Sequence, residues 1–287
     1  EISCPVGIGN AEYSERLREE VSSMGVLFPT HEKIMDNIQK TKNPFGESIH
    51  KQIKEGNEIV YFRGCMGLYR ENDIADSTIK LLEKANVSYA LVDEVCCGSV
   101  ALRTGNEKIA RELSKENLEK IKHTGAKTVI FSCAGCLRTF IKDYPNFEDI
   151  NLRFIHSSQY FLELINEGRL KLKGSKNFKV TFHDPCHMGR HLKIYEEPRE
   201  IIKKLPNVEF VEMKRAKEDS RCCGAGGGVK SLFGDLSTSM AIERINDAKE
   251  IEAEIIVSTC PFCKRNLKDA SEMKIIDLSE LLLEYVS

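Results

Sequence analysis

The chain has 287 residues, 41% of them hydrophobic, which is enough for one large domain or two of ordinary size. Its formal net charge of −2 at pH 7 provides no basic field of the kind that nucleic-acid-binding surfaces need, so we expect no nucleic-acid partner. No apolar stretch approaches the roughly 18–20 residues of a membrane-spanning helix, and no secretory signal pattern opens the chain. These features predict a cytoplasmic protein with no transmembrane segment of its own, which a partner subunit could hold at a membrane.

Residues 1–57 predict a helical lead-in. Two helical patterns, near 11–24 and 31–40, precede a turn with the sequence TKNPFGES (41–48). Near the start, Cys4 is followed by proline, as is the last cysteine ligand of ferredoxin-like modules. This pattern predicts that the lead-in contains the end of such a module, with Cys4 as one ligand of a ferredoxin-type [4Fe-4S] cluster. The alternative is an isolated thiol near a chain end.

From residue 58 onward, β-branched or aromatic apolar runs alternate with helical patterns. In the first half the runs EIVYFRGC (58–65), VSYALVDEVCC (87–97) and KTVIFSC (127–133) alternate with helices at 73–85 and 106–123. The second half repeats this order, with runs at 178–186, 208–223 and 253–260 and helices at 197–205 and 235–252. Each half closes with a further strand and helix, at 152–168 and 274–286. The alternation predicts an α/β fold with a small parallel sheet covered by helices in each of two domains, 58–172 and 173–287.

The cysteines show that the two halves are duplicates. Ten of the eleven form two sets that share one order: a single cysteine, a Cys-Cys-Gly motif, and a Cys-x-x-Cys motif. The offsets between corresponding cysteines are 121, 126 and 127 positions (186−65, 222−96 and 260−133), which indicates a doubled domain. The first set is Cys65, Cys96, Cys97, Cys133 and Cys136, and the second is Cys186, Cys222, Cys223, Cys260 and Cys263.

Each set is expected to converge on one object, because every motif follows a predicted strand and ligands sit at the carboxyl edge of parallel sheets. A zinc ion takes four ligands, commonly from two Cys-x-x-Cys-like pairs, whereas each set here offers five thiols and one such pair. Adjacent cysteines favour a polynuclear iron–sulfur cluster, because neighbouring thiolates can bind different irons of the same cluster. Gly98 and Gly224 allow the backbone to turn closely around it. Zinc sites and buried free thiols remain as alternatives.

The cysteine pattern resembles the CCG domain of the B- or D-type catalytic subunits of heterodisulfide reductase, over residues 58–287. The stretches NPFG (43–46), CCGSVALRTG (96–105), HDPCHMGRH (183–191) and CCGAGGG (222–228) also resemble the wider family, which includes iron–sulfur subunits of glycerol-3-phosphate, lactate and glycolate dehydrogenases. The resemblance implies a noncubane [4Fe-4S] cluster in each five-cysteine set. All ten cysteine positions are filled, which favours the reductase branch.

Histidines and arginines near the cysteines are further candidates. His187 directly follows Cys186, so it could hydrogen-bond a cluster or supply a proton to a leaving thiolate, and we name it as the candidate catalytic residue. Its alternative is a structural role, as for His183 and His191, because Pro185 interrupts a helix there. The arginines balance thiolate charge or bind an anionic group of a substrate: Arg103, Arg138 and Arg190. His123 and His156 are expected to be surface or packing residues.

The duplication points to disulfide reduction. Cleaving a disulfide takes two electrons, and two facing clusters could each deliver one electron and capture one sulfur. The resemblance implies the coenzyme M–coenzyme B heterodisulfide as substrate, and ferredoxin-like, flavoprotein or membrane cytochrome subunits as partners. The alternatives are an electron-relay subunit of a quinone-linked dehydrogenase and a zinc-stabilised interaction module.

Overall fold

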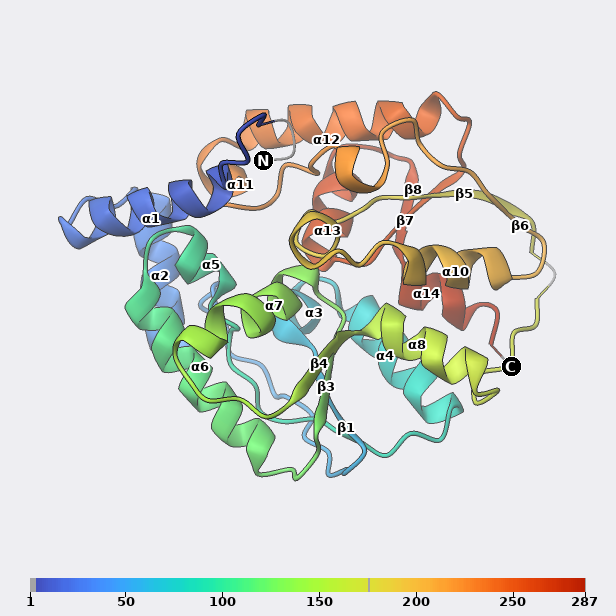
Figure 1. The fold of residues 1–287 in the computed structure, drawn as a ribbon, viewed down its shortest axis with the longest axis horizontal. Helices are drawn as coiled ribbons and strands as arrows, with labels where there is room; N and C mark the ends of the chain where they lie inside the picture. Colours follow the sequence, from blue (N-terminus) through green and yellow to red (C-terminus); the bar gives the residue numbers. More distant parts are fainter. Residues whose placement is uncertain (1–3, 175, 287) are drawn as a thin grey trace.

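The computed structural model describes residues 4–174 and 176–286 of the chain. Each half forms a parallel four-stranded sheet, with the strand order β2-β1-β3-β4 in the first half and β6-β5-β7-β8 in the second. The shared order confirms the predicted α/β fold with two duplicated halves (Figure 1). The strands are β1 (Ile59–Phe62), β2 (Tyr89–Ala90), β3 (Thr128–Phe131), β4 (Arg153–His156), β5 (Phe178–Phe182), β6 (Val208–Phe210), β7 (Ile255–Ser258) and β8 (Lys274–Asp277).

Helices connect the strands of each sheet, as parallel strands require. The first half contains α3 (Gly64–Tyr69), α4 (Asn72–Lys84), α5 (Ser99–Arg103), α6 (Glu107–Lys122), α7 (Ala134–Arg138) and α8 (Ser157–Asn166). The second half contains α9 (Gly189–Leu192), α10 (Glu196–Lys204), α11 (Val229–Leu232), α12 (Gly234–Lys249), α13 (Pro261–Asp269) and α14 (Leu278–Leu283). In the part of the chain that the structure describes, none of the helices is long and apolar enough to cross a bilayer.

The central strands are apolar along their length because helices cover both faces of each sheet. Every residue of β1 and of β7 is buried. The register pairs Phe62 with Phe131 and Phe182 with Val257, so neighbouring central strands end at the same edge of their sheet. The segments that follow these strands therefore start side by side.

Four helices join the halves in a reciprocal arrangement. Helices α4 and α10 follow the first strand of their halves, and α8 and α14 follow the last. α4 packs against α14, and α8 packs against α10, which is the pattern that a pseudo-twofold axis produces (Figure 1). Their apolar faces share one core with both sheets, to which each helix contributes buried side chains such as Leu81, Phe161, Ile201 and Leu281. The two halves are therefore held face to face by hydrophobic burial.

The N-terminal segment contains the two predicted helices, α1 (Asn10–Ser23) and α2 (Pro29–Thr41). No side chain of α1 is buried, but Arg18 donates to the carbonyls of Arg103 at 2.8 Å and Gly227 at 2.9 Å. From α2, the buried His31 lies 3.1 Å from the Ser231 hydroxyl. The lead-in therefore contacts both halves next to their Cys-Cys-Gly loops.

Candidate metal centres

The Cys-x-x-Cys motifs lie directly after the central strands. Cys133 follows β3 and Cys260 follows β7, and each is the N-cap of the next helix, α7 or α13. The lone Cys65 lies in the first turn of α3, just past β1. These positions agree with the location that the strand pattern predicts.

The adjacent cysteines are placed differently from the prediction. β2 ends at Ala90 and β6 at Phe210, so Cys96 and Cys222 are reached through loops and not directly from a strand. In the first half the chain leaves the sheet early because Leu91 pairs with Lys54 of the lead-in, through two backbone hydrogen bonds. Contacts other than sheet pairing must therefore hold the adjacent cysteines in place.

Buried ion pairs hold these loops. Arg63 follows β1 and donates to Glu94, from Nε at 2.9 Å and from Nη2 at 2.6 Å, two residues before Cys96. In the second half the charges are exchanged, since Asp184 follows β5 and accepts from Arg199 at 2.7 and 2.9 Å. Arg199 also donates to Glu212, on the long loop. Because each charge has a buried partner, the ion pairs tie the single-cysteine segment to the loop that carries the pair.

The glycine after each pair lets the backbone donate to the sulfurs. Gly98 has φ +82° and Gly224 has φ +86°, and a Cβ on Gly224 would lie 2.5 Å from the Ser237 carbonyl oxygen. In both halves, each sulfur of the pair interacts with the backbone N–H two residues further along. The Gly224 N–H lies 3.3 Å from Cys222 Sγ. Such N–H groups stabilise anionic sulfur.

Within each half the five thiols interact in a continuous row. Cys223 Sγ lies 3.2 Å from Cys263 Sγ. The row of the first half is Cys65, Cys96, Cys97, Cys136 and Cys133. The row of the second half is Cys186, Cys222, Cys223, Cys263 and Cys260. The structure thus brings together the members of each set that the sequence defines.

The two rows meet at one point. Cys133 interacts with Cys136 of its own set and with Cys260 of the other set. Cys133 and Cys260 are each the first cysteine of a Cys-x-x-Cys motif. They are therefore equivalent residues of the two halves, and their contact is consistent with the pseudo-twofold symmetry. The ten sulfurs therefore form one row across the molecule, and the first set meets the second at the centre of this row.

The crowding of the thiols fits a polynuclear metal centre. All of these cysteines are free, and eight of the ten are buried, Cys186 and Cys222 being partly exposed. The pKa of Cys96 is raised well above its usual value by Cys65, and the pKa of Cys136 by Cys133, because a hydrogen bond between the sulfurs favours the protonated thiol and because neighbouring thiolates repel. Bound metal cations relieve this repulsion and deprotonate the thiols. Five converging sulfurs per set fit an iron–sulfur cluster better than a four-coordinate zinc ion.

His187 lies where the two sets meet. A Cβ on Gly135 would lie 3.5 Å from His187 Nδ1, 3.7 Å from Cys133 Sγ and 3.7 Å from Ser99 Oγ, so these three atoms surround one small space. Burial lowers the pKa of His187 to about 4, and the charge of the protonated His191 acts in the same direction. The His187 ring is therefore neutral at neutral pH. The residue as a whole is nevertheless partly exposed.

The three candidate arginines all have partners within the protein. Arg103 binds Glu15 at 2.5 Å and also Asp143, and Arg138 binds Asp143 at 2.8 Å. Arg190 donates to the carbonyl of Ser220 at 2.6 Å, just before the second pair. These contacts favour structural roles at the cysteine loops.

The other histidines differ in their environments. His123 is exposed at the end of α6, as expected of a surface residue. His156 is buried, caps α8, and has Nε2 3.0 Å from the Thr259 carbonyl of the other half, as expected of a packing residue. His183, which the sequence indicates only as a loop histidine, has a ring nitrogen within 4.8 Å of the sulfurs of Cys223 and Cys263. The signal that could have identified it is its place at the end of a buried strand, where His replaces the Phe62 of the first half.

Cys4 lies outside both rows. Its pKa is lowered by the backbone N–H groups of Ile8 and Val6, which turn around the thiol. That turn is compatible with a ligand, and the ferredoxin-type role of Cys4 stays a prediction.

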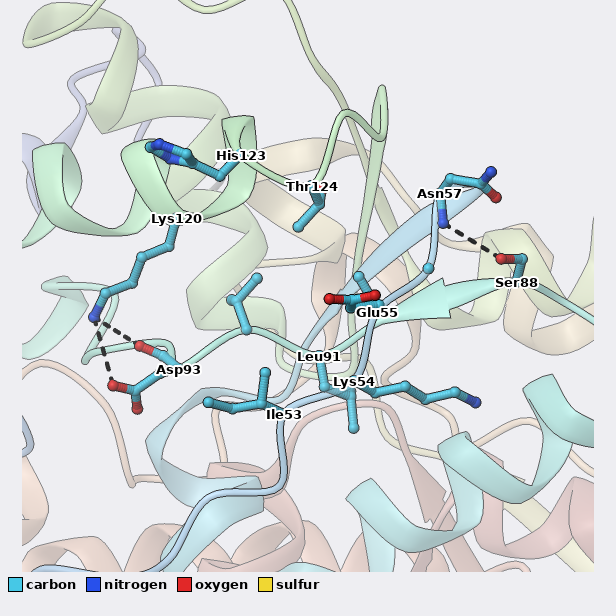
Figure 2. A pocket seen from close by; sticks show the side chains of 13 residues that line it. Ile53, Lys54, Glu55, Asn57, Ser88, Leu91, Asp93, Lys120, His123 and Thr124 are labelled. Carbon is cyan, nitrogen blue, oxygen red and sulfur yellow. Dashed lines mark hydrogen bonds and ion pairs between the residues drawn. The ribbon is translucent and has the colours of Figure 1, made fainter.

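A cleft of about 800 Å³ lies between the lead-in, β2 and the end of α6, and no cysteine lines it. Figure 2 shows contacts among its lining residues, since Lys120 Nζ donates to the Asp93 backbone carbonyl and the Asn57 backbone N–H donates to the Ser88 hydroxyl. The cleft is therefore separate from the sulfur rows.

Comparison with known proteins identifies the family of the chain. The CCG cysteine-rich domain matches residues 59–141 and 180–268, one match in each half. The chain is 36% identical, over 98% of its length and 74% of the relative's, to the D-type subunit of the dihydromethanophenazine:CoB–CoM heterodisulfide reductase of Methanosarcina mazei. The chain belongs to the CCG-domain iron–sulfur oxidoreductases, in the family of the D-type heterodisulfide reductase subunits. The family supports iron–sulfur clusters in this chain.

Two other proteins are similar to this chain, one in sequence and one in fold. The EtfAB:quinone oxidoreductase of Syntrophomonas wolfei is 29% identical over 97% of this chain, which spans 44% of that protein. A crystal structure of a hypothetical protein from Helicobacter pylori superposes with a TM-score of 0.66 over 96% of this chain and 57% of that one. At 10% identity, that second match shows the fold alone. Relatives of this chain thus include more than one kind of redox protein.

Proposed function

We propose that the chain reduces a disulfide at two [4Fe-4S] clusters, one in each five-cysteine set, both of the noncubane type. The observation that carries the proposal is the contact between Cys133 and Cys260, which puts the two sets next to each other on the pseudo-twofold relation. A disulfide is nearly symmetric about its S–S bond, so a site with two matched halves suits it. The clusters, when bound, supply one electron each.

The residues of the chain would hold and orient the substrate between the sets. Ser99 Oγ and His187 Nδ1 flank the small space beside Gly135, next to Cys133 Sγ. The neutral His187 ring can hydrogen-bond a sulfur there and direct a proton to it. The balanced reaction is R–S–S–R′ with two electrons and two protons giving R–SH and R′–SH. The lack of a side chain at Gly135 leaves this small space beside Cys133 Sγ and His187 Nδ1 open.

The substrate class follows from the relatives. The heterodisulfide reductase named above acts, by its name, on the CoB–CoM disulfide, and the same disulfide is our proposed substrate. Electrons would come from other redox subunits, of the ferredoxin-like, flavoprotein or membrane cytochrome kind, since the relatives are subunits of redox complexes.

Disulfide reduction predicts a cluster signal that depends on the thiol products. We expect anaerobically prepared, oxidised protein to develop a new paramagnetic signal when coenzyme M or coenzyme B is added, because a product thiol has access to the clusters. We also expect a reduced viologen dye to drive cleavage of the heterodisulfide. EPR titration and a thiol-release assay measure these effects. Clusters without either response would contradict the proposed function.

Replacement of His187 by glutamine should slow disulfide cleavage by about 10²- to 10⁴-fold, the usual contribution of a positioned proton donor. The cluster signals should be unchanged, because His187 is not one of the ten sulfur ligands. His123→Gln is the matched control, since His123 is exposed and its ring Nδ1 lies 2.6 Å from the Glu119 carbonyl of its own helix. Equal rates for the two variants would remove His187 from the mechanism.

An electron-relay role is the alternative, and the likeness to EtfAB:quinone oxidoreductase favours it. In a relay the clusters pass electrons between partner subunits and no bond is cleaved at them. A relay would show full cluster reduction by a flavoprotein partner with no thiol release from any disulfide, so the assay above separates the two functions.

A further inference from the structure

His183 is a buried side chain that the proposed chemistry leaves unused. It follows β5, is 1% exposed, and has a ring nitrogen within 4.8 Å of Cys223 Sγ and Cys263 Sγ. Its Nε2 is buried and has no hydrogen-bond partner among the residues that the structure describes. A buried polar atom without a partner is costly, so the sulfur centre is the natural partner for this nitrogen.

Arg244 determines which ring nitrogen carries the proton. Its Nε–H donates to His183 Nδ1 at 3.2 Å, and a guanidinium can only donate. Nδ1 is therefore the acceptor, and the single proton of the neutral ring lies on Nε2. Arg244 is itself fully buried and donates to the Arg215 carbonyl at 2.6 Å, so its position is fixed. Nε2 thus carries an N–H that can donate, and in this protonation state it is not a ligand to iron.

The first half lacks both members of this pair. The residues that pack on the glycine of each Cys-Cys-Gly motif are Ala110 in α6 and Ser237 in α12. Seven residues further along each helix lie Asn117 and Arg244, which therefore correspond.

Neither counterpart donates to a sulfur. Phe62 corresponds to His183 at the end of the first strand and packs against Phe131 and Phe140. Asn117 donates to the carbonyl of Cys96 at 3.2 Å and accepts from a backbone N–H. The two sets are thus matched in sulfur but differ in this donor.

We propose that His183 donates an Nε2–H hydrogen bond to a cysteine sulfur of the second set, and that this makes the second cluster easier to reduce than the first. The proposal rests on the proposed function in requiring one cluster in each set. A hydrogen bond to sulfur stabilises the more negative, reduced cluster and raises its potential. The partial exposure of Cys186 and Cys222 acts in the same direction. A single electron that enters the site therefore settles on the second cluster, and His183 is a positioning residue for it.

The test is a redox titration of the anaerobically prepared full chain, followed by EPR. Wild-type protein should show two separate cluster midpoints. His183→Phe copies the first half, and it should change the one-electron reduction equilibrium of one cluster about tenfold, which lowers that midpoint by about 59 mV. His183→Gln retains an N–H and should keep the wild-type midpoints. His156→Asn is the matched control, because His156 is buried near Cys260 but its Nε2 faces a carbonyl.

A second measurement covers the case in which His183→Phe does not fold. With isotope-labelled nitrogen in the histidine rings, wild-type protein should show a weak nitrogen coupling to the second cluster, and His183→Gln should lack this coupling. A coupling as strong as that of a nitrogen bound directly to iron, or no coupling that depends on His183, would overturn the proposal. So would unchanged midpoints in a folded His183→Phe protein that still reduces the disulfide, in which case the proposed function stands. Absence of both clusters would overturn the two proposals together.

Discussion

Replacement of Cys97 by alanine is expected to remove about half of the iron and acid-labile sulfide from the chain and to abolish disulfide cleavage. On the premise of two four-iron clusters, the wild-type chain holds about eight irons, and the variant about four. Cys97 lies within the first row of sulfurs, interacting with Cys96 and Cys136, so its loss breaks one centre and leaves the other. Turnover should fall by more than about 100-fold, since even groups outside the ligand set change activity by 10- to 100-fold. Iron and sulfide analysis with the thiol-release assay measures both effects.

Two matched variants make this result specific. Cys223→Ala removes the equivalent sulfur of the second row and should give the same loss. Cys4→Ala, in the same 287-residue chain, lies outside both rows and should retain about eight irons. Zinc in place of iron, or equal iron loss in all three variants, would contradict the two-centre arrangement.

Glu94→Ala is expected to destabilise the protein by about 3–5 kcal/mol, because it leaves the buried Arg63 guanidinium without its partner. Glu94 is 1% exposed and accepts from Arg63 through both carboxylate oxygens and from the Arg63 backbone N–H at 3.0 Å. At about 2–4 °C per kcal/mol, the melting temperature should fall by roughly 10 °C. Circular dichroism of anaerobically prepared protein measures this shift.

The control for this substitution is Glu107→Ala, which removes an exposed ion pair with Arg111 one turn away in α6. Such pairs contribute about 0.3–0.5 kcal/mol, so the melting temperature should change by no more than about 2 °C. A similar small change for Glu94→Ala would show that the buried pair does not hold the cysteine loop.

Local pattern was sufficient to predict much of the fold. The apolar runs before Cys65, Cys133, Cys186 and Cys260 form strands because both faces of each sheet are covered, and continuous apolar runs are the mark of such strands. The long loops before Cys96 and Cys222 were not predictable in this way. Their course depends on the backbone pairing of Leu91 with Lys54 and on buried ion pairs, and neither leaves a periodic signal.

The sequence by itself determined that the domain is doubled and which five thiols belong to each set, because spacing along the chain reports which residues share one sheet edge. The tertiary structure alone decided that Cys133 meets Cys260, that His187 lies beside that contact, and that His183 faces the sulfurs of the second set. These residues lie in different loops or in different halves. Which of their atoms meet is set by the reciprocal packing of α4 with α14 and α8 with α10, through many small contacts that no single stretch of sequence records.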